Sequence, residues 1–342
     1  MSEFLKKHSL LAVLFSVLLL VQCDVVQPKE DDKKTSLHPV LLNGEWGYIN
    51  NSGNLVIEPR YDEAREFQDG YAAVRRGTTW GYVSESTGEL VISPQFSVAG
   101  DFSEDLAPAQ LPGGQYGFIN TNGEFVISAS YDFATAFSEG FAAVRSDGLW
   151  GYVSTSGELT IPLQFSDAQP FSEKFAAVET AQGWVYIDES GNEVIKTTFR
   201  ITAAGEFSNG KAAIQTSEGW GYIDNTGSPV ITPEFDEAGK FAQKLAWVRN
   251  DDFIGFINAD GELKIPYQFS EVRSFNEDRA AVRVSSDWFF IDKSRGIIVI
   301  NEGFDAAENF NNGIARVQLG EEENARYGYI NKEGEYVWYP TN

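Results

Sequence analysis

A short pattern of aromatic, glycine and aliphatic residues recurs along most of the chain. Its first copy is Trp46-Gly47-Tyr48-Ile49, and eight similar tetrapeptides follow. The nine copies begin at residues 46, 80, 116, 150, 184, 220, 254, 288 and 327, so that successive copies are 34, 36, 34, 34, 36, 34, 34 and 39 residues apart. A near-constant period of this length indicates tandem structural repeats.

Each repeat predicts a three-stranded antiparallel β-meander. A glycine comes seven or eight residues after the start of every tetrapeptide, and an apolar triplet such as Leu55-Val56-Ile57 follows it. Glycine at this point accepts the positive φ of a hairpin turn between two strands. A run of small residues such as Ala72-Ala73-Val74 precedes the next tetrapeptide and supplies a further strand. The remaining residues, which include two aromatic positions, are expected to form a connection held against the core.

Alternation along these strands predicts two different faces. Successive strand residues point to opposite sides, so Trp46 and Tyr48 share one face and Gly47 and Ile49 share the other. Gly47 leaves room for a second layer or another backbone to approach closely. We expect most tetrapeptide tryptophans to be core residues, namely Trp46, Trp80, Trp150 and Trp220.

The fold class is therefore all-β, a tandem array of about nine meander repeats of 34–36 residues. One such unit cannot bury its own aromatic face, so stacked units form the stable object. The array is either an open solenoid or superhelix, or a closed β-propeller. Propeller blades usually have four strands, whereas the unit shows three, and no blade is split between the chain ends. The sequence therefore favours the open array.

The order Trp-Gly-Tyr-Ile, Gly, Val-Ile-Pro, Tyr-Asp, Phe and Ala-Ala-Val resembles the bacterial WG-repeat family, also called the KWG-repeat family. The resemblance covers about residues 40–339. Val185, Ile254 and Phe289 depart from the tetrapeptide and indicate decayed repeats within the same fold. The resemblance implies a β-rich repeat scaffold in a bacterial, often exported, protein. It carries no agreed catalytic residues.

The N-terminal segment predicts export. Lys6 and Lys7 precede residues 10–21, which are apolar except for Ser16. A basic segment before an apolar run of this length is typical of a secretory signal peptide, and twelve residues are too few to span a membrane.

Cys23, the only cysteine, follows this apolar run where a bacterial lipoprotein is acylated. The segment Leu20-Val21-Gln22-Cys23 resembles a lipobox, although Gln22 replaces the usual small residue. We expect a signal peptide at 1–22, lipidated Cys23 with a flexible polar tether at 23–39, and the repeat domain at 40–342. The alternative is an ordinary secretory signal and a secreted or periplasmic protein.

Composition removes several classes of function. The chain of 342 residues has one Cys and two His, and His38 lies in the expected tether as a solvated residue. Metal sites built from Cys and His, and nucleophiles paired with His, therefore lack their residues. Glycine-rich phosphate loops and calcium-binding loops are also absent from the sequence. We expect no enzyme activity, no catalytic residues, no cofactor and no metal.

The charge of the chain points to particular partners. Asp and Glu number 50 and Lys and Arg 26, which gives a net charge of −24. Such a surface repels nucleic acid and attracts basic partners, and repetition favours a repetitive partner through avidity. Four aspartates recur at one position of their units, so we expect turn or capping residues instead of a catalytic pair: Asp62, Asp132, Asp236 and Asp305.

The leading hypothesis is a non-enzymatic scaffold, anchored to the bacterial envelope by its lipid, that binds an envelope protein or polymer through an extended acidic surface. The alternative is a carbohydrate-binding, lectin-like module that uses exposed aromatics, with Trp247 and Trp338 as candidate contacts. A row of exposed aromatics on one face would favour sugar binding. Non-repeating polar residues that converge on one pocket would favour an enzyme.

Overall fold

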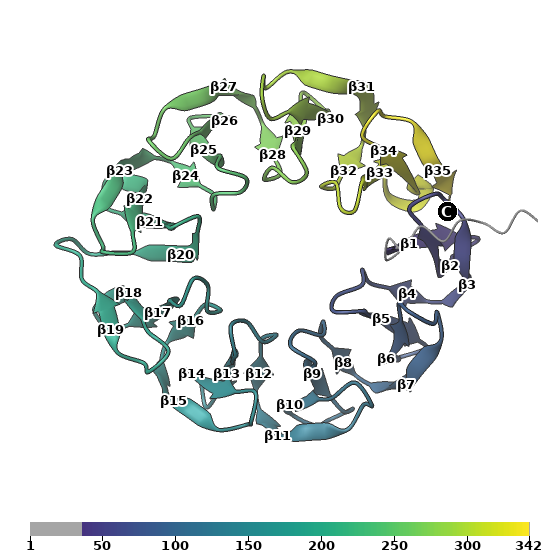
Figure 1. Cartoon of the computed structure of the whole chain (residues 1–342), viewed down its shortest axis with the longest axis horizontal. Helices are drawn as coiled ribbons and strands as arrows, with labels where there is room; N and C mark the ends of the chain where they lie inside the picture. The colour runs from purple at the N-terminus through teal and green to yellow at the C-terminus, as the bar shows by residue number, and fades with distance from the viewer. Residues whose placement is uncertain (1–35, 342) are drawn as a thin grey trace, which may run out of the picture. The chain divides into compact units, whose positions relative to one another are not determined.

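The computed structural model describes residues 36–341, which form a ring of nine antiparallel sheets (Figure 1). The sheets follow one another around the ring in chain order, and the last sheet packs against the first. We call each sheet a blade and number the blades 1 to 9 in chain order, so that blade 1 contains the first tetrapeptide and blade 9 the ninth. This is a nine-bladed β-propeller, so the expected open solenoid or superhelix is wrong and the closed alternative is the arrangement found. The expected signal peptide, Cys23 and most of the expected tether lie outside the described residues.

Within a blade, the strands are arranged in chain order, with the first strand nearest the ring axis and the last at the outer rim, as Figure 1 shows. The innermost strands are β4 (Glu63–Ala64), β8 (Val98–Ala99), β12 (Phe133–Ala134), β16 (Asp167–Ala168), β20 (Ala203–Ser208), β24 (Glu237–Ala238), β28 (Glu271–Val272) and β32 (Ala306–Ala307). The second strands are β1 (Leu37–Leu42), β5 (Tyr71–Arg76), β9 (Ala107–Gln110), β13 (Phe141–Ser146), β17 (Ala176–Thr180), β21 (Lys211–Thr216), β25 (Ala246–Asn250), β29 (Arg279–Val284) and β33 (Ile314–Leu319).

The third strands carry the tetrapeptides, and the fourth strands form the rim. The third strands are β2 (Glu45–Asn50), β6 (Thr79–Ser84), β10 (Tyr116–Ile119), β14 (Leu149–Ser154), β18 (Gly183–Ile187), β22 (Gly219–Asp224), β26 (Phe253–Ile257), β30 (Asp287–Asp292) and β34 (Arg326–Asn331). The rim strands are β3 (Leu55–Tyr61), β7 (Leu90–Phe96), β11 (Phe125–Tyr131), β15 (Leu159–Phe165), β19 (Glu193–Ile195), β23 (Pro229–Phe235), β27 (Leu263–Phe269), β31 (Ile298–Phe304) and β35 (Tyr336–Thr341). A 3-10 turn, η1 (Glu322–Asn324), lies between β33 and β34.

The innermost strand is the element that the sequence did not reveal. In blade 2, only Glu63 and Ala64 pair with β5, opposite Arg75 and Val74. Seven of the eight innermost strands have two residues, which is too short to show a period-2 pattern. The expected three-stranded meander is thus a four-stranded blade in eight of nine described blades, and the argument from strand number against a propeller fails.

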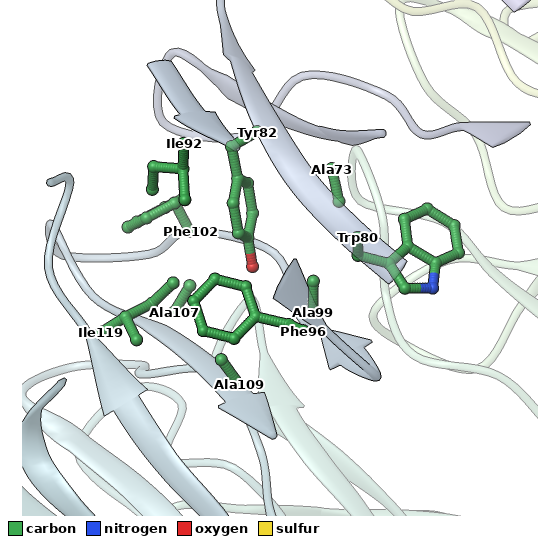
Figure 2. Packing of buried hydrophobic residues seen from close by; sticks show 10 residues of the cluster. All are labelled: Ala73, Trp80, Tyr82, Ile92, Phe96, Ala99, Phe102, Ala107, Ala109 and Ile119. Carbon is green, nitrogen blue, oxygen red and sulfur yellow. The ribbon is translucent and has the colours of Figure 1, made fainter. Parts of the chain in front are cut away.

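A hydrophobic core fills each boundary between blades. At the boundary of blades 2 and 3, Tyr82 and Phe96 of blade 2 pack against Phe102 of blade 3 (Figure 2). The rings of Tyr82 and Phe102 lie 4.8 Å apart in an edge-on arrangement. The Tyr82 hydroxyl also donates a hydrogen bond to the Gly100 carbonyl of blade 3, at 2.7 Å. The third tetrapeptide residue therefore joins its own blade to the next one.

The two predicted faces of the tetrapeptide strand are confirmed. Trp46 and Tyr48 pack in the core shared with blade 2, whereas Ile49 packs in the core shared with blade 9. Of the four tryptophans expected in the core, Trp80 is buried and the other three are half-buried. The fully buried aromatic ring of the tetrapeptide is its third residue, as at Tyr48.

Gly151 shows why the tetrapeptide has glycine at its second position. Trp150 pairs with Phe165 and Tyr152 with Ile161, so the rim strand has two extra residues there and bulges toward β14. A Cβ on Gly151 would lie 2.5 Å from the Ile161 carbonyl oxygen. The predicted close approach to this glycine is thus made by the backbone of its own blade.

Blade 1 and blade 9 close the ring through side chains, without a shared strand. The Tyr329 hydroxyl of blade 9 donates to the Pro39 carbonyl of β1 at 2.8 Å. The Thr341 hydroxyl of β35 donates to the Leu41 carbonyl at 2.6 Å. Val40 and Ile49 of blade 1 bury their side chains against Tyr329 and Ile314. These contacts repeat the hydrogen bond and the apolar packing of the other boundaries.

His38 is part of this closure and is not a solvated tether residue. Strand β1 begins at Leu37, and His38 is only 2% exposed. Its ring lies 5.6 Å from that of Tyr329, where other boundaries place a phenylalanine such as Phe102. Blade 1 has no innermost strand among the described residues, so the imidazole supplies the missing aromatic contact.

Candidate functional site

The two aromatic residues that the sequence suggested as carbohydrate contacts, Trp247 and Trp338, lie apart in the structure. Trp247 lies on β25 in blade 7, half-buried, with its indole against Gly239. Trp338 lies on β35 in blade 9, also half-buried, and its indole N–H donates to the Thr341 hydroxyl at 3.0 Å. Because they are on different blades and each contacts the core of its own region, they do not form a joint platform.

Exposed aromatic side chains are scattered around the ring. In residues 36–341 the exposed aromatic residues are Phe133, Phe253 and Tyr339, in blades 4, 7 and 9, and the first two are less than half exposed. Tyr339 is 74% exposed and stacks on Tyr336. Because these three exposed residues belong to different blades, they do not form, within residues 36–341, a row of the kind that favours sugar binding.

The four repeated aspartates are turn residues, as expected. Each carboxylate accepts a hydrogen bond from a backbone N–H fifteen residues later, in the hairpin between the second and third strands of its blade. The donors are Gly77 for Asp62 (2.6 Å), Asp147 for Asp132 (2.9 Å), Asp251 for Asp236 (2.7 Å) and Gly320 for Asp305 (2.6 Å). The prediction of turn or capping roles is confirmed, and these residues are not gathered in one catalytic pair.

A second set of acidic residues connects the blades near the ring axis. These residues lie in the turns that follow the innermost strands, which point toward the axis in Figure 1. Each side chain accepts a hydrogen bond from the backbone of the next blade. We call this set the acidic rim; it surrounds the ring axis and is separate from the rim strands at the outer edge. The acceptors and their backbone N–H donors are Asp69 with Glu104 N (2.9 Å), Glu104 with Gly140 N (3.0 Å), Glu139 with Glu173 N (2.8 Å), Glu173 with Gly210 N (2.9 Å) and Glu277 with Gly313 N (3.0 Å).

The carboxylates of the acidic rim bond neighbouring blades together and are also at least partly exposed to solvent. Asp69, Glu104, Glu139 and Glu173 are exposed, and Glu277 is half-exposed. In blade 7 the same bond is made by a neutral side chain, because the Gln243 amide oxygen accepts from Asp278 N at 2.9 Å. The hydrogen bond therefore needs an acceptor oxygen but not a negative charge. The charges of Asp69, Glu104, Glu139 and Glu173 are exposed and can act on a partner, whereas Glu277 forms an ion pair with Lys332 at 3.0 Å.

A cavity of about 700 Å³ lies between blades 7 and 8. Its lining includes five basic side chains and two carboxylates: Lys244, Lys264, Arg279, Lys293 and Arg295, with Asp278 and Asp292. This cationic pocket stands out in a chain with nearly twice as many acidic as basic residues. It is a convergence of polar residues in one place, and sequence reasoning missed it.

Most of these cations replace the residue that the repeat has elsewhere. Lys264 stands where most units have valine, as at Val56, and Lys244 stands where several units have glycine, as at Gly70. Arg279 opens its strand at a position that is aromatic or aliphatic in most units, although blade 6 has Lys211 there. Aligning the units with one another, position by position, shows these basic substitutions. The overall composition does not show them, because the chain as a whole is acidic.

Ion pairs hold part of the cationic pocket in place. Arg279 contacts Asp292 at 3.1 Å, and Lys293 contacts Asp278 at 3.1 Å. Hydrogen bonds from the Ser294 hydroxyl and from backbone N–H groups, together with Arg279, hold the pKa of Asp292 below its ordinary value. Asp292 is therefore ionised at neutral pH and suits charge pairing, whereas a general acid needs a raised pKa.

The described part of the chain has neither a cluster of metal-ligating side chains nor a membrane-spanning helix. Within residues 36–341 no three His, Cys, Asp or Glu side chains gather closely enough to hold a metal ion. None of the described residues belongs to a helix long and apolar enough to cross a membrane.

Solved structures similar to this chain share its fold at low identity. The computationally designed Ika8 protein is 13% identical over 86% of this chain and 100% of its own, with a TM-score of 0.53. The eukaryotic initiation factor is 12% identical over 88% and 94%, with a TM-score of 0.66. Dihydro-heme d1 dehydrogenase NirN is 11% identical over 92% and 75%, with a TM-score of 0.50. These likenesses establish the fold alone, and no curated protein sequence matches the chain.

A family model described as WG containing repeat matches eight segments, which are residues 46–77, 80–114, 116–150, 150–184, 184–218, 220–252, 254–286 and 288–322. Each segment begins at a tetrapeptide, and the ninth tetrapeptide, at Tyr327, forms the third strand of the last blade. The matches span most of the chain. The chain therefore belongs to the WG containing repeat family.

Proposed function

We propose that this propeller is a non-enzymatic binding scaffold that holds a basic partner, an envelope protein or polymer, against its acidic rim. The repeated carboxylates near the ring axis carry the proposal. Four similar exposed carboxylates on one ring, at Asp69, Glu104, Glu139 and Glu173, allow weak contacts to add through avidity with a repetitive partner. A concentration of negative charge also raises the encounter rate with basic surfaces.

The test removes charge from the rim and keeps one backbone hydrogen bond at each changed position. Gln243 supplies the precedent, so we design the triple variant Glu104→Gln, Glu139→Gln and Glu173→Gln, in which Glu139→Gln gives up one of its two acceptor contacts, to Lys174 N or Glu173 N. With oligolysine as the basic probe, we expect the association rate of the parent protein to fall steeply between low and physiological salt, since charges are screened within about 8 Å there. The variant is expected to associate several-fold more slowly at low salt and with a weaker salt dependence than the parent. Equal rates for the two proteins would contradict the proposal.

The same proposal includes export and a lipid anchor at Cys23. The support is the sequence of the first 23 residues, which lie outside the described part of the chain. We expect the protein expressed in bacteria to partition into the detergent phase, and Cys23→Ala to stay unprocessed or enter the aqueous phase. Equal partition of the two proteins with normal cleavage would show an ordinary secretory signal instead.

A further inference from the structure

The cationic pocket between blades 7 and 8 carries more positive charge than its own carboxylates neutralise. Five basic side chains and two carboxylates line it, a surplus of three positive charges. The opposite surplus prevails over the whole chain, with a net charge of −24. Like charges held close together raise the free energy of the empty pocket, and an anion relieves this cost.

The partners of each cation show which charges are available. Arg279 and Lys293 pair with the two lining carboxylates, and Arg295 lies 3.9 Å from Asp292, which Arg279 already contacts. Lys264 contacts Glu262, an exposed residue next to the pocket. Lys244 has no carboxylate within ion-pair distance among residues 36–341.

Arg279 also has an unused donor. Its Nε atom is buried and has no hydrogen-bond partner among the described residues. A buried donor without an acceptor is costly, and buried polar groups are ordinarily paired. An oxyanion in the pocket is an acceptor for such a donor, since guanidinium groups bind phosphate and carboxylate oxygens strongly.

We infer that this pocket is a binding site for a compact ligand with two or three oxyanionic groups, phosphate or carboxylate. The volume of about 700 Å³ is that of a small-molecule site. A long anionic polymer fits poorly, because Glu277 directly precedes the lining residue Asp278 and the chain as a whole has a net charge of −24. This inference does not depend on the proposed function of the acidic rim, and either can be correct without the other.

The repeats themselves supply variants that keep the fold. Lys244→Gly restores the residue of other units at a position where φ is +73°, and Lys264→Val restores the common valine. The matched control is Lys174→Gly, which removes a lysine from the equivalent turn of blade 5, where φ is +70°. Lys174 does not line the cationic pocket.

The experiment is calorimetric titration of the full-length protein with inorganic pyrophosphate and, separately, with citrate. We expect saturable binding of at least one probe at one site per chain. The Lys244→Gly/Lys264→Val variant should lose about tenfold or more in affinity, because two charge-assisted contacts are removed, and Lys174→Gly should bind like the parent.

Three results would overturn the inference. The first is no saturable binding of either probe. The second is an equal loss of affinity in Lys174→Gly, which indicates only a general charge effect. The third is tighter binding of long-chain polyphosphate than of pyrophosphate, which contradicts a compact ligand. The relative affinities of pyrophosphate and citrate identify the preferred anionic group.

Discussion

Raising the pH above about 10 is expected to unfold the propeller in one cooperative transition, because buried tyrosines join the blades. Six tetrapeptides have a buried tyrosine at their third position, namely Tyr48, Tyr82, Tyr152, Tyr186, Tyr222 and Tyr329. Each hydroxyl donates a hydrogen bond to a backbone carbonyl of the next blade. Burial raises the pKa of all six hydroxyls above the ordinary value of about 10.

The sign and size of the effect follow from linkage. A group whose pKa is raised in the folded state contributes its full stability below its unfolded pKa and loses it as the pH rises beyond that value. Here the loss begins near pH 10, where the unfolded chain ionises its tyrosines and the folded chain does not. Each buried tyrosine removes about 1.4 kcal/mol per pH unit, so six remove about 8 kcal/mol per unit. Because whole domains are stable by only about 5–15 kcal/mol, the transition should be complete within one or two pH units.

The measurement follows tyrosinate absorbance and far-ultraviolet circular dichroism together against pH. The triple variant Tyr152→Phe, Tyr186→Phe and Tyr222→Phe is the comparison, since the same position is naturally phenylalanine in three other blades, as at Phe118. It loses about 1 kcal/mol per hydrogen bond at neutral pH but should unfold at a higher pH. If the six tyrosines instead ionise gradually while the β-sheet signal persists, the hydroxyls are not held as the structure has them.

Periodic features of this fold could be predicted because each is repeated many times along the chain. The tetrapeptide gives the third strand, the turn glycine gives the hairpin, and the alternation of Tyr48 and Ile49 gives the two faces. The repeated aspartates, as at Asp62, are turn residues for the same reason. A feature that occurs in every unit is distinguishable from chance in a single sequence.

Closure and the cationic pocket could not be predicted, for two different physical reasons. Closure depends on the rotation accumulated from blade to blade and on one special boundary, where His38 replaces a phenylalanine of another unit's connection. Innermost strands such as Glu63–Ala64 are defined by pairing, and two residues carry no periodic signal. The pocket consists of single departures, such as Lys264, that come from two neighbouring units and meet only in the folded ring.

Removing the ninth blade, residues 305–341, is expected to abolish cooperative folding. The truncation exposes one face of blade 1 and one face of blade 8. On blade 1 it uncovers Val40, Ile49 and His38, and on blade 8 it uncovers Phe290 and the residues around it. Each fully buried large side chain contributes about 1.5–3 kcal/mol, so losing both boundaries removes an amount comparable with the whole stability of a domain. An open array, by contrast, would lose one end repeat and one boundary.

A circular permutant of residues 36–341 tests whether the truncated protein fails to fold because the ring is open or only because its chain has been altered. A flexible linker of about ten residues, which spans about 18 Å, joins residue 341 to residue 36, and new ends are opened in the exposed turn at Asp147 and Gly148. All nine blades and boundaries remain, and the closing contacts were never covalent, so the permutant should melt within a few degrees of unpermuted residues 36–341. Thermal unfolding followed by circular dichroism compares these two proteins with the truncated one. The prediction is wrong if the truncated protein melts cooperatively near the parent temperature and the permutant fails to fold. The boundary of Tyr329 and Pro39 would then contribute little to stability, and the ring would not be held closed in solution.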